Sequence, residues 1–267
     1  MSPTILVVGA TGNTGRGVVE TLSELLKTNT TLSGHKILAL TRCSGGATAQ
    51  RLAKLPSVEV EEQNWVEITP DWLRQHQVVR AFIASHNQPN QFAEESTFHL
   101  AALNGGVQYV VRISTTAANV RPDCAAYLFS TDTLRLMASE DAPVGIIDPY
   151  EVGIFAAHLL TQDDVAPHDK AKYILNGPED ITGRQVVAMV EQYIGTKVED
   201  VRFQDLSFVD HLATQTEESK NVIMSIKHAA DTAWEGKCTA STTSKQVLQL
   251  AAPKNAPAKV FKTMLEE

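Results

Sequence analysis

The stretch Ile5-Leu6-Val7-Val8-Gly9-Ala10-Thr11-Gly12-Asn13-Thr14-Gly15 decides the fold. A short apolar run, rich in residues that favour β-strands, meets a turn that contains three glycines. Apolar residues then repeat at helical spacing at Val18, Leu22, Leu25 and Leu26. The order of elements is therefore a strand, a tight turn and a helix.

The glycines of this turn have the spacing G-x-x-G-x-x-G, a variant of the dinucleotide-binding fingerprint. We expect Gly9 to allow the sharp exit from the strand, Gly12 to let backbone amides approach a pyrophosphate, and Gly15 to let the helix pack closely on the strand. The start of the helix would offer unpaired N–H groups and a positive dipole end to the phosphates. The residues expected to contact a cofactor here are Gly9, Thr11, Gly12, Asn13, Thr14 and Gly15. A tight turn without a ligand is the alternative, but the flanking strand and helix favour nucleotide binding.

Length and charge limit the classes of protein to consider. A chain of 267 residues fits one large α/β domain, or one domain with an appended subdomain. The formal net charge of −8 argues against a nucleic-acid or anionic-membrane surface. No apolar run reaches the length of a membrane span.

The cysteines and the start of the chain indicate a compartment. Cys43, Cys124 and Cys238 are few and widely spaced, which predicts a reducing environment with neither a disulfide framework nor a metal site. The first apolar run has no basic flank and leads directly into the glycine turn, unlike a signal peptide. We therefore expect a cytoplasmic protein.

Four further β-rich runs follow the first helix, at residues 35–41, 58–61, 78–85 and 109–113. Segments with helical spacing or helix-favouring residues separate them. This alternation predicts an α/β fold with a doubly wound, mainly parallel sheet of the Rossmann type, covered on both faces, followed by a smaller C-terminal part.

Later segments of the chain give weaker signals. Helical spacing predicts helices over 127–138 and 152–160, and short apolar runs predict strands at 146–149 and 173–178. Thr182-x-x-Gln185 has the form of a capping box and predicts the start of one more helix.

Arg42 follows the second predicted strand, where an NAD-specific site usually carries an acidic residue for the adenosine ribose. No carboxylate lies between Ile37 and Ala53. An arginine at this position suits a 2′-phosphate, which it can hold by charge-assisted hydrogen bonds. The sequence therefore predicts NADP(H) as the cofactor in preference to NAD(H). A solvated surface arginine is the alternative.

Polar residues also follow the other strands. Asn64, at the end of the third strand, is a candidate contact for the adenine, whereas its neighbour Trp65 could equally pack in the core. Ser85 and His86 follow the fourth strand, and Ser114 follows the fifth. Because doubly wound sheets bind ligands outside the carboxyl ends of their strands, we expect these three residues near the nicotinamide half of the cofactor. A solvent-facing loop position is the alternative for His86.

Several stretches together carry a family resemblance. They are residues 7–15, 41–42, 111–114, 147–152 and 176–183. They resemble the NmrA-like family of atypical short-chain dehydrogenase/reductases, and the resemblance covers most of the chain apart from residues 202–237. It implies a Rossmann domain, an NAD(P) cofactor and a small C-terminal substrate subdomain. We accordingly place the NAD(P)-binding domain at 1–141, and the remaining Rossmann elements with the substrate subdomain at 142–267.

The sequence departs from the family pattern in two ways. Family members usually carry several dozen residues between the helix after the fifth strand and the Ile-Asp strand, but here Met137 and Ile147 are ten positions apart. We expect the sheet to lose a strand and one wall of the active site to be open or rebuilt. The second departure is that Tyr127, which follows Ser114 by the spacing common in classical relatives, has no lysine four positions later, where Thr131 stands. A phenol without that lysine has a pKa of about 10, and a partly buried helix tyrosine is the alternative to a catalytic one.

The resemblance implies either a reductase, as in quinone reductases and enzymes of fungal aromatic-polyketide pathways, or a cofactor-sensing regulator. We expect an NADPH-dependent oxidoreductase that transfers hydride to a small quinone or aromatic ketone, such as an aromatic polyketide. The catalytic candidates are Ser114, Tyr127 and His86. A non-catalytic NADP-sensing protein that acts on a protein partner is the alternative, and a redox-neutral enzyme is a third. The expected partner is a small-molecule substrate, with neither nucleic acid nor membrane.

Overall fold

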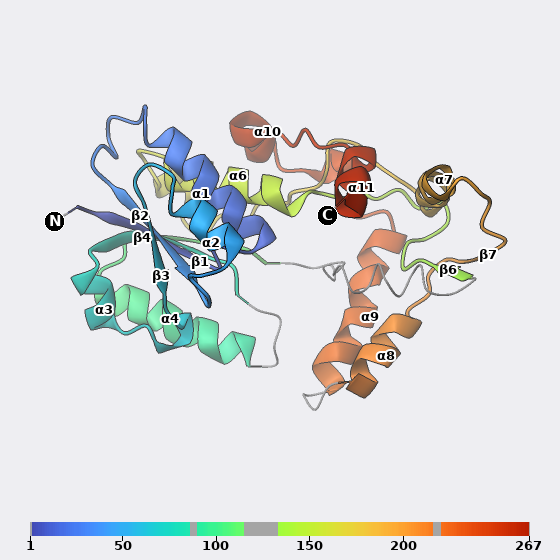
Figure 1. Ribbon diagram of the computed structural model, residues 1–267, viewed down its shortest axis with the longest axis horizontal. Coiled ribbons are helices and arrows are strands. Elements are labelled where there is room, and N and C mark those ends of the chain that lie inside the picture. The colour runs from blue at the N-terminus through green and yellow to red at the C-terminus, as the bar shows by residue number, and fades with distance from the viewer. Residues whose placement is uncertain (1, 86–89, 115–132, 216–219, 267) are drawn as a thin grey trace. The chain divides into compact units, whose positions relative to one another are not determined.

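A computed structural model describes residues 2–85, 90–114, 133–215 and 220–266 (Figure 1). The chain divides into two compact units. The sheet unit consists of Met1–Ser114, Pro149–Tyr173 and Gln249–Ala252. The helical unit consists of Thr115–Asp148, Ile174–Leu248 and Pro253–Glu267.

The sheet unit contains the predicted parallel sheet. Its strands are β1 (Thr4–Val8), β2 (Lys36–Thr41), β3 (Val58–Glu62), β4 (Val78–Ile83) and β5 (Tyr109–Arg112). All neighbours pair in parallel, in the order β3-β2-β1-β4-β5. The α/β Rossmann-type fold is thus confirmed. Within the described residues the sheet ends at β5.

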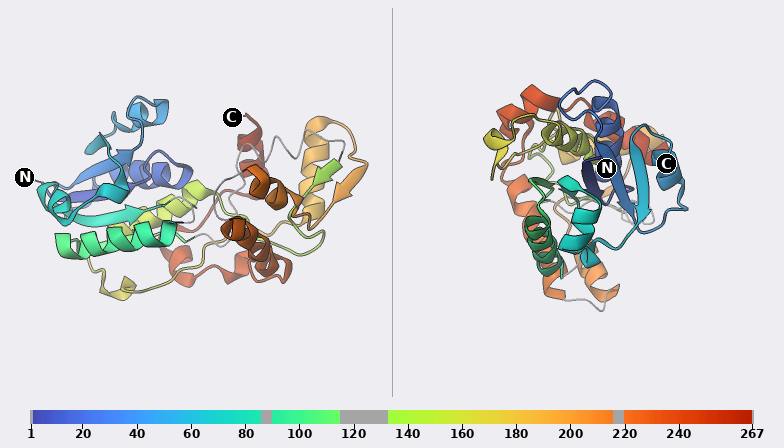
Figure 2. Two further views of the ribbon diagram at one scale, coloured as in Figure 1. Left: turned by 90° about the horizontal axis from the view of Figure 1, so that it is seen from below. Right: turned by 90° about the vertical axis from the view of Figure 1, so that its left-hand side faces the viewer.

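Helices cover both faces of this sheet, as Figures 1 and 2 show. The helical elements of the unit are α1 (Asn13–Leu25), α2 (Ala47–Leu52), η1 (Trp65–Glu67), α3 (Pro70–Gln75), α4 (Gln91–Gly105), α6 (Pro149–Leu160) and η2 (Ala166–His168). Helices α1 and α6 lie along one face, and α3 and α4 lie along the other. The helix predicted over 152–160 is confirmed as part of α6.

Two hydrophobic cores result from this layering. Ile5 and Val7 of β1 pack toward α1 and α6, whereas Leu6 and Val8 pack toward α3 and α4. All four side chains are at most 1% exposed. A strand covered on both faces reads as a continuous apolar run, which is why the alternation of polar and apolar residues is missing in β1.

Close backbone contact joins α1 to α6. A Cβ atom on Gly153 would lie 2.2 Å from the Thr14 carbonyl oxygen, and one on Gly17 would lie 2.5 Å from the Tyr150 carbonyl oxygen. Beside this crossing the Tyr150 hydroxyl donates to Glu20 Oε2 at 2.7 Å. Burial, with that hydrogen bond, raises the pKa of Tyr150 to about 12, so the phenol remains a donor at neutral pH. The start of α1 is therefore held firmly against α6.

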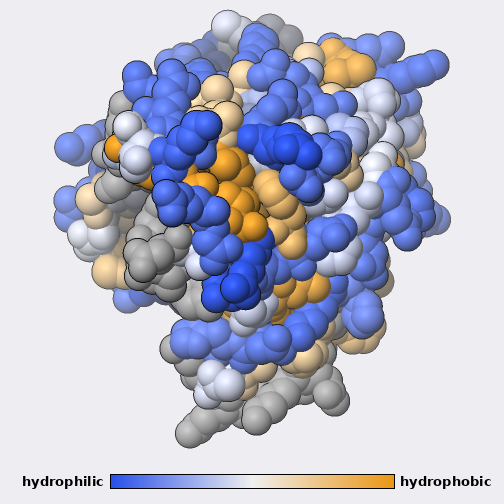
Figure 3. Space-filling model, turned by 90° about the vertical axis from the view of Figure 1, so that its right-hand side faces the viewer, coloured by the Kyte–Doolittle hydropathy of each residue, from blue (hydrophilic) through white to orange (hydrophobic). Residues whose placement is uncertain are grey.

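The helical unit is built from short elements around a small core. They are β6 (Thr133–Arg135), α7 (Gly183–Ile194), β7 (Asp200–Arg202), α8 (Ser207–Gln215), α9 (Lys220–Trp234), η3 (Ala240–Thr242), α10 (Lys245–Ala251, whose last residues belong to the sheet unit) and α11 (Pro257–Glu266). Strand β6 pairs in parallel with β7. Leu134, Leu136 and Val190 form the buried core, while Tyr193 remains 60% exposed. On the face drawn in Figure 3, hydrophobic residues gather near the middle within a hydrophilic border.

The capping box predicted at Thr182 is confirmed, because the Thr182 hydroxyl accepts from the Gln185 N–H and Gln185 Oε1 accepts from the Thr182 N–H. Across the described residues, no helix has the length and hydropathy to cross a membrane.

Three predictions of secondary structure are wrong. Residues 133–135, expected inside a helix over 127–138, form β6, and positions 127–132 lie outside the described residues. Residues 146–148 form no strand, and Pro149 starts α6, where its fixed φ is favourable. The stretch 173–178 is extended but belongs to no strand, because its backbone N–H groups bind elsewhere. Ile174 and Asn176 donate to the hydroxyls of Ser244 and Thr243, and Gly177 donates to the Gly145 carbonyl.

Candidate functional site

The turn between β1 and α1 has the geometry that its glycines predict. Gly9 has φ +76°, and a Cβ there would lie 2.8 Å from the Ala84 carbonyl oxygen. A Cβ on Gly15 would lie 2.0 Å from the Gly9 carbonyl oxygen, so only glycine lets the helix approach this closely. The Gly12 N–H donates to Gly9 at 3.1 Å and closes the turn. The turn therefore carries the backbone of Gly12 and the start of α1 to the carboxyl end of β1.

The N-terminus of α1 is suited to an anion. Gly12 is the N-cap, with extended φ/ψ of −75° and 169°, and no side chain caps the helix. The first turn of α1 contains no acidic residue. A helix of 13 residues with an uncapped start presents N–H donors and a positive dipole end, which bind phosphate groups well. Asn13 and Thr14 stand in this first turn.

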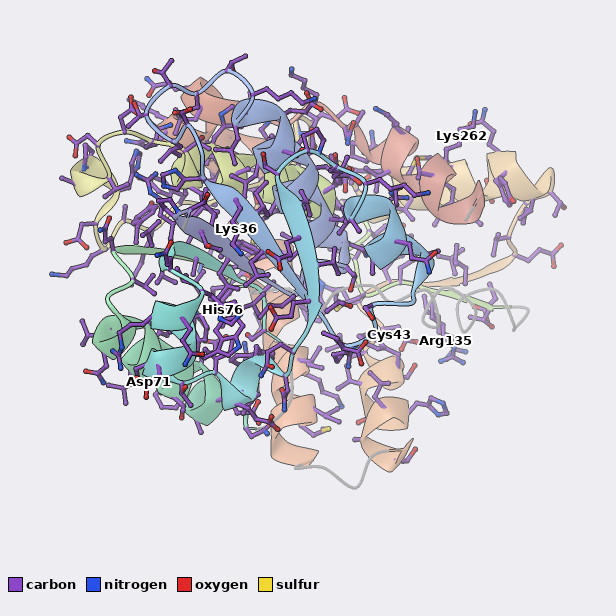
Figure 4. All side chains as sticks on the ribbon, turned by 60° about the vertical axis from the view of Figure 1, so that its left-hand side comes forward. Lys36, Cys43, Asp71, His76, Arg135 and Lys262 are labelled. Carbon is purple, nitrogen blue, oxygen red and sulfur yellow. The ribbon has the colours of Figure 1, made fainter. Side chains whose placement is uncertain are left out.

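A pocket of about 300 Å³ lies beside this turn. Its lining residues are Thr11, Thr41, Arg42, Cys43, Gly46, Ala47, Thr48 and Ala49. Figure 4 labels Lys36 at the start of β2 and Cys43 just beyond its end, so the pocket lies at the carboxyl edge of the sheet. Cofactors of doubly wound proteins bind along this edge.

Hydrogen bonds fix the loop that follows β2. The Thr41 hydroxyl donates to the Cys43 carbonyl at 3.2 Å and accepts from the Cys43 N–H at the same distance. It also lies 3.4 Å from the Thr11 hydroxyl, which links the loop to the glycine turn. Among the described residues the exposed Arg42 side chain has no ion-pair partner. The guanidinium at the pocket is therefore available to an anionic ligand.

A carboxylate that sequence reasoning missed stands close to this loop. Glu62, the last residue of β3, accepts hydrogen bonds at Oε2 from the N–H and the hydroxyl of Ser44, both at 2.9 Å. The bond from the Ser44 N–H, with the one from its hydroxyl, lowers the pKa of Glu62 below its ordinary value. Glu62 lies outside residues 37–53, because the neighbouring strand β3, and not the chain next to Arg42, brings it to this loop. The available signal was an acidic residue at the end of the strand that neighbours β2.

The structure does not favour Asn64 as an adenine contact. Its Oδ1 accepts from the Val66 N–H at 3.3 Å, and its Nδ2 donates to Glu67 at 3.0 Å. Asn64 thus caps the short helix η1. Trp65 packs edge-on against Phe98 with ring centroids 6.2 Å apart, which agrees with the alternative of core packing.

A polar network centred on the buried Glu95 lies at the end of β4. The Ser85 hydroxyl donates to Glu95 Oε1, and Gln91 Nε2 donates to the Ser85 hydroxyl at 2.9 Å and to Glu95 Oε1 at 3.0 Å. Arg112 Nε, at the end of β5, donates to Glu95 Oε2 at 2.5 Å. Glu95 is only 5% exposed. Burial alone would raise the Glu95 pKa, but the hydrogen bonds from Ser85, Arg112 and Gln91 hold it below its ordinary value.

The remaining predicted site residues are Ser114, His86 and Tyr127. Ser114 is exposed just beyond β5, at the same edge of the sheet as Ser85. His86 and Tyr127 lie outside the described residues. Within the described ranges, no group of three or more His, Cys, Asp or Glu residues could hold a metal ion. The structure thus places the glycine turn, Arg42, Ser85 and Ser114 along one edge of the sheet.

Solved structures of similar architecture include proteins crystallised with NADPH, NADP(H) or NADP. The NADPH-dependent quinone oxidoreductase QOR2 from Escherichia coli, complexed with NADPH, has a TM-score of 0.70 and 17% identity, over 98% of this chain and 100% of that chain. The triphenylmethane reductase of Citrobacter sp., complexed with NADP(H), has a TM-score of 0.67 and 16% identity, over 98% of this chain and 99% of that chain.

A regulator shares the architecture as well. NmrA, a negative transcriptional regulator in complex with NADP, has a TM-score of 0.55 and 15% identity, over 90% of this chain and 84% of that chain. No protein-family model and no curated protein matches the sequence. At these identities the likeness establishes the fold alone, and at that level it confirms the resemblance to NmrA-like proteins.

Proposed function

We propose that this protein is an NADPH-dependent oxidoreductase that reduces a small quinone or an aromatic ketone. The observation that carries the proposal is a pocket that lies beside the start of α1 and is lined by Arg42. Among the described residues Arg42 has no ion-pair partner and no side chain caps this helix start. The Arg42 guanidinium suits a phosphate, and the N-terminus of α1, which follows the glycine turn, suits a pyrophosphate. The structural neighbours crystallised with NADPH or NADP support the same cofactor.

Each part of the edge has a role in this proposal. Backbone N–H groups of Asn13, Thr14 and Gly15 would hold the pyrophosphate, because among the described residues no side chain caps this helix start, while the Gly12 N–H closes the turn on the Gly9 carbonyl. Arg42 would hold the 2′-phosphate by charge-assisted hydrogen bonds. The ends of β4 and β5, with Ser85 and Ser114, would face the nicotinamide half, which supplies a hydride when NADPH is bound.

A quinone is the acceptor that this chain's residues suit best. Tyr127 is followed four positions later by Thr131, so it lacks the lysine that would make the phenol a better acid. With NADPH bound, a quinone would accept the hydride with its two electrons, leaving NADP⁺, and would take a proton from water to complete the hydroquinone. An unactivated ketone depends more strongly on a positioned acid.

The test has two stages. NADPH and NADH are titrated by fluorescence, and the loss of NADPH is then followed against a panel of quinones and aromatic ketones. Tighter binding of NADPH together with quinone turnover supports the proposal. Absence of binding for both cofactors would contradict it.

A second candidate function is an NADP-sensing regulator without a reaction of its own. The likeness to NmrA and the absence of a lysine four positions after Tyr127 favour it. Tight NADPH binding without turnover of any acceptor in the panel would support the sensor over the reductase.

A further inference from the structure

The hydrogen-bonding capacity of Ser85 is almost fully used. A serine hydroxyl has one proton to donate and two lone pairs to accept with. Ser85 gives its proton to Glu95 Oε1 and takes one hydrogen bond from Gln91 Nε2 at 2.9 Å. Among the described residues nothing else binds this hydroxyl, so one lone pair remains.

Glu95 keeps the Ser85 proton in this direction. Its carboxylate is buried, with 5% exposure, and has a charged partner in Arg112, whose Nε donates to Oε2 at 2.5 Å. An ionised carboxylate only accepts hydrogen bonds. Because the Glu95 carboxylate can only accept, the Ser85 hydroxyl has to donate its proton to Glu95 and not to a ligand.

Ser85 also stands at the place where the strand order reverses. Strand β1 has β2 on one side and β4 on the other, and Ser85 follows β4. The preceding carbonyl, that of Ala84, would contact a Cβ on Gly9 at 2.8 Å, so the end of β4 adjoins the glycine turn. Ligands of doubly wound sheets bind at this reversal, with the second half of a dinucleotide on the β4 side.

We propose that Glu95 is a positioning residue that holds Ser85 as a hydrogen-bond acceptor for a donor on the nicotinamide half of NADP. The donor is the carboxamide N–H or a hydroxyl of the adjoining ribose. This inference rests on the proposed function. It also means that Ser85 acts as an acceptor and supplies no proton to the reduced substrate.

The experiment measures the affinity of NADP⁺ and of 2′-phosphoadenosine 5′-diphosphate, which lacks both the nicotinamide and its ribose, by calorimetry. Ser85→Ala removes the acceptor and should weaken NADP⁺ binding by about 3- to 10-fold, the size expected for one hydrogen bond. The affinity for 2′-phosphoadenosine 5′-diphosphate should change by less than about 2-fold, because one missing contact elsewhere leaves its own contacts intact. Ser96→Ala is the matched control, since it removes a hydroxyl of α4, the helix that carries Glu95, and this hydroxyl donates to the Phe92 carbonyl.

Glu95→Gln tests the direction of the proton. Arg112 Nε still needs an acceptor oxygen, so the new amide nitrogen would face Ser85 and donate to it. The Ser85 proton would then turn toward the ligand and oppose the ligand's donor. We expect NADP⁺ to weaken at least as much as in Ser85→Ala. In a Ser85→Ala background, Glu95→Gln should weaken NADP⁺ no further.

The outcomes separate the positioning role from a structural one. An equal loss of affinity for both ligands in Glu95→Gln would show that Glu95 only maintains the fold. Unchanged NADP⁺ affinity in Ser85→Ala would overturn the contact even if Glu95→Gln fails to fold. If the wild type binds neither ligand, the proposed function fails and this inference fails with it.

A third ligand assigns the donor. The 3-acetylpyridine analogue of NADP⁺ keeps the carbonyl and lacks the carboxamide N–H. A wild-type preference for NADP⁺ over this analogue that disappears in Ser85→Ala supports the carboxamide as donor. Equal binding of the two, with equal losses in Ser85→Ala, supports the ribose hydroxyl.

Discussion

Thr41 of β2 pairs in register with Glu62 of β3, and this pairing brings an acidic side chain to the loop that carries Arg42. The Glu62 carboxylate is bound there by Ser44, two residues beyond Arg42. A cation that lines the pocket proposed for the 2′-phosphate and an anion that holds the adjoining loop thus stand at neighbouring strand ends. If the proposed site is correct, we expect the balance of these two charges to set how strongly it distinguishes NADPH from NADH.

Glu62→Gln should increase this preference. The Ser44 hydrogen bonds keep the Glu62 pKa low, so the side chain is charged at neutral pH and opposes a 2′-phosphate. Removing one exposed charge should tighten NADPH by about 2- to 5-fold and leave NADH unchanged or weaker. Fluorescence titrations at low and high salt measure this. The gain should shrink as salt rises, and a gain that salt does not affect would argue against an electrostatic cause.

Arg42→Ala should weaken NADPH selectively. A hydrogen bond to a charged group contributes about 1.5–3 kcal/mol, which is roughly ten- to a hundred-fold in affinity. NADH should be almost unaffected. Arg74→Ala is the matched control, because Arg74 is paired with Asp71 on α3. Equal losses for NADPH and NADH would show that Arg42 makes no contact with a 2′-phosphate.

Gly12→Val should abolish cofactor binding in a protein that still folds. The residue has extended φ/ψ, so a side chain is allowed there, and its Cβ would lie 3.3 Å from the Gly9 carbonyl oxygen. The rest of the valine would fill the space through which a pyrophosphate reaches the backbone. Circular dichroism checks the fold and a titration checks NADPH. Wild-type affinity in the folded variant would exclude this turn as the phosphate site.

Tyr127→Phe should change quinone turnover by less than about ten-fold. Positioned acid catalysis normally contributes 10²–10⁴-fold, and hydride transfer to a quinone depends on it least. Steady-state rates with saturating NADPH are the measurement. A loss of about a thousand-fold with NADPH binding intact would instead make Tyr127 the proton donor.

Gly153→Ala should destabilise the sheet unit by about 1–3 kcal/mol or more, because its Cβ would meet the Thr14 carbonyl at 2.2 Å and force α1 and α6 apart. Gly45→Ala is the control, since nothing lies within 4 Å of a Cβ at that position. Urea unfolding measures both. Equal stability of the two variants would mean that the crossing adjusts at little cost.

The sheet could be predicted from sequence because its signals are local. The apolar run from Ile5 to Val8 reads directly as a strand with both faces covered, and the Thr182–Gln185 capping box lies within one turn of helix. The roles of the glycines at 9 and 15 also follow from a short-range pattern. Gly15 lets α1 approach the Gly9 carbonyl, and Gly9 lets the turn approach the Ala84 carbonyl after β4.

The wrong predictions of secondary structure arise where distant residues decide the structure. The proximity of Glu62 to the Arg42 loop, which the sequence analysis missed, likewise follows from strand pairing. Residues 173–178 have the composition of a strand, but hydroxyls some 70 positions away take their N–H groups. Residues 133–135 become a strand only because residues 200–202 pair with them. Spacing within one segment contains no information on such partners.

The position of α6 in the chain has a consequence for biosynthesis. Ala156, Ala157 and Leu160 cover the face of the sheet on which α1 rests, yet they follow residue 114 by more than forty positions. During translation the first five strands leave the ribosome before this cover exists, and their apolar face stays open to chaperones or to misassembly. A fragment cut after Ser114 would therefore lack part of its core. We therefore do not expect the first five strands and the glycine turn to fold as an independent module without α6.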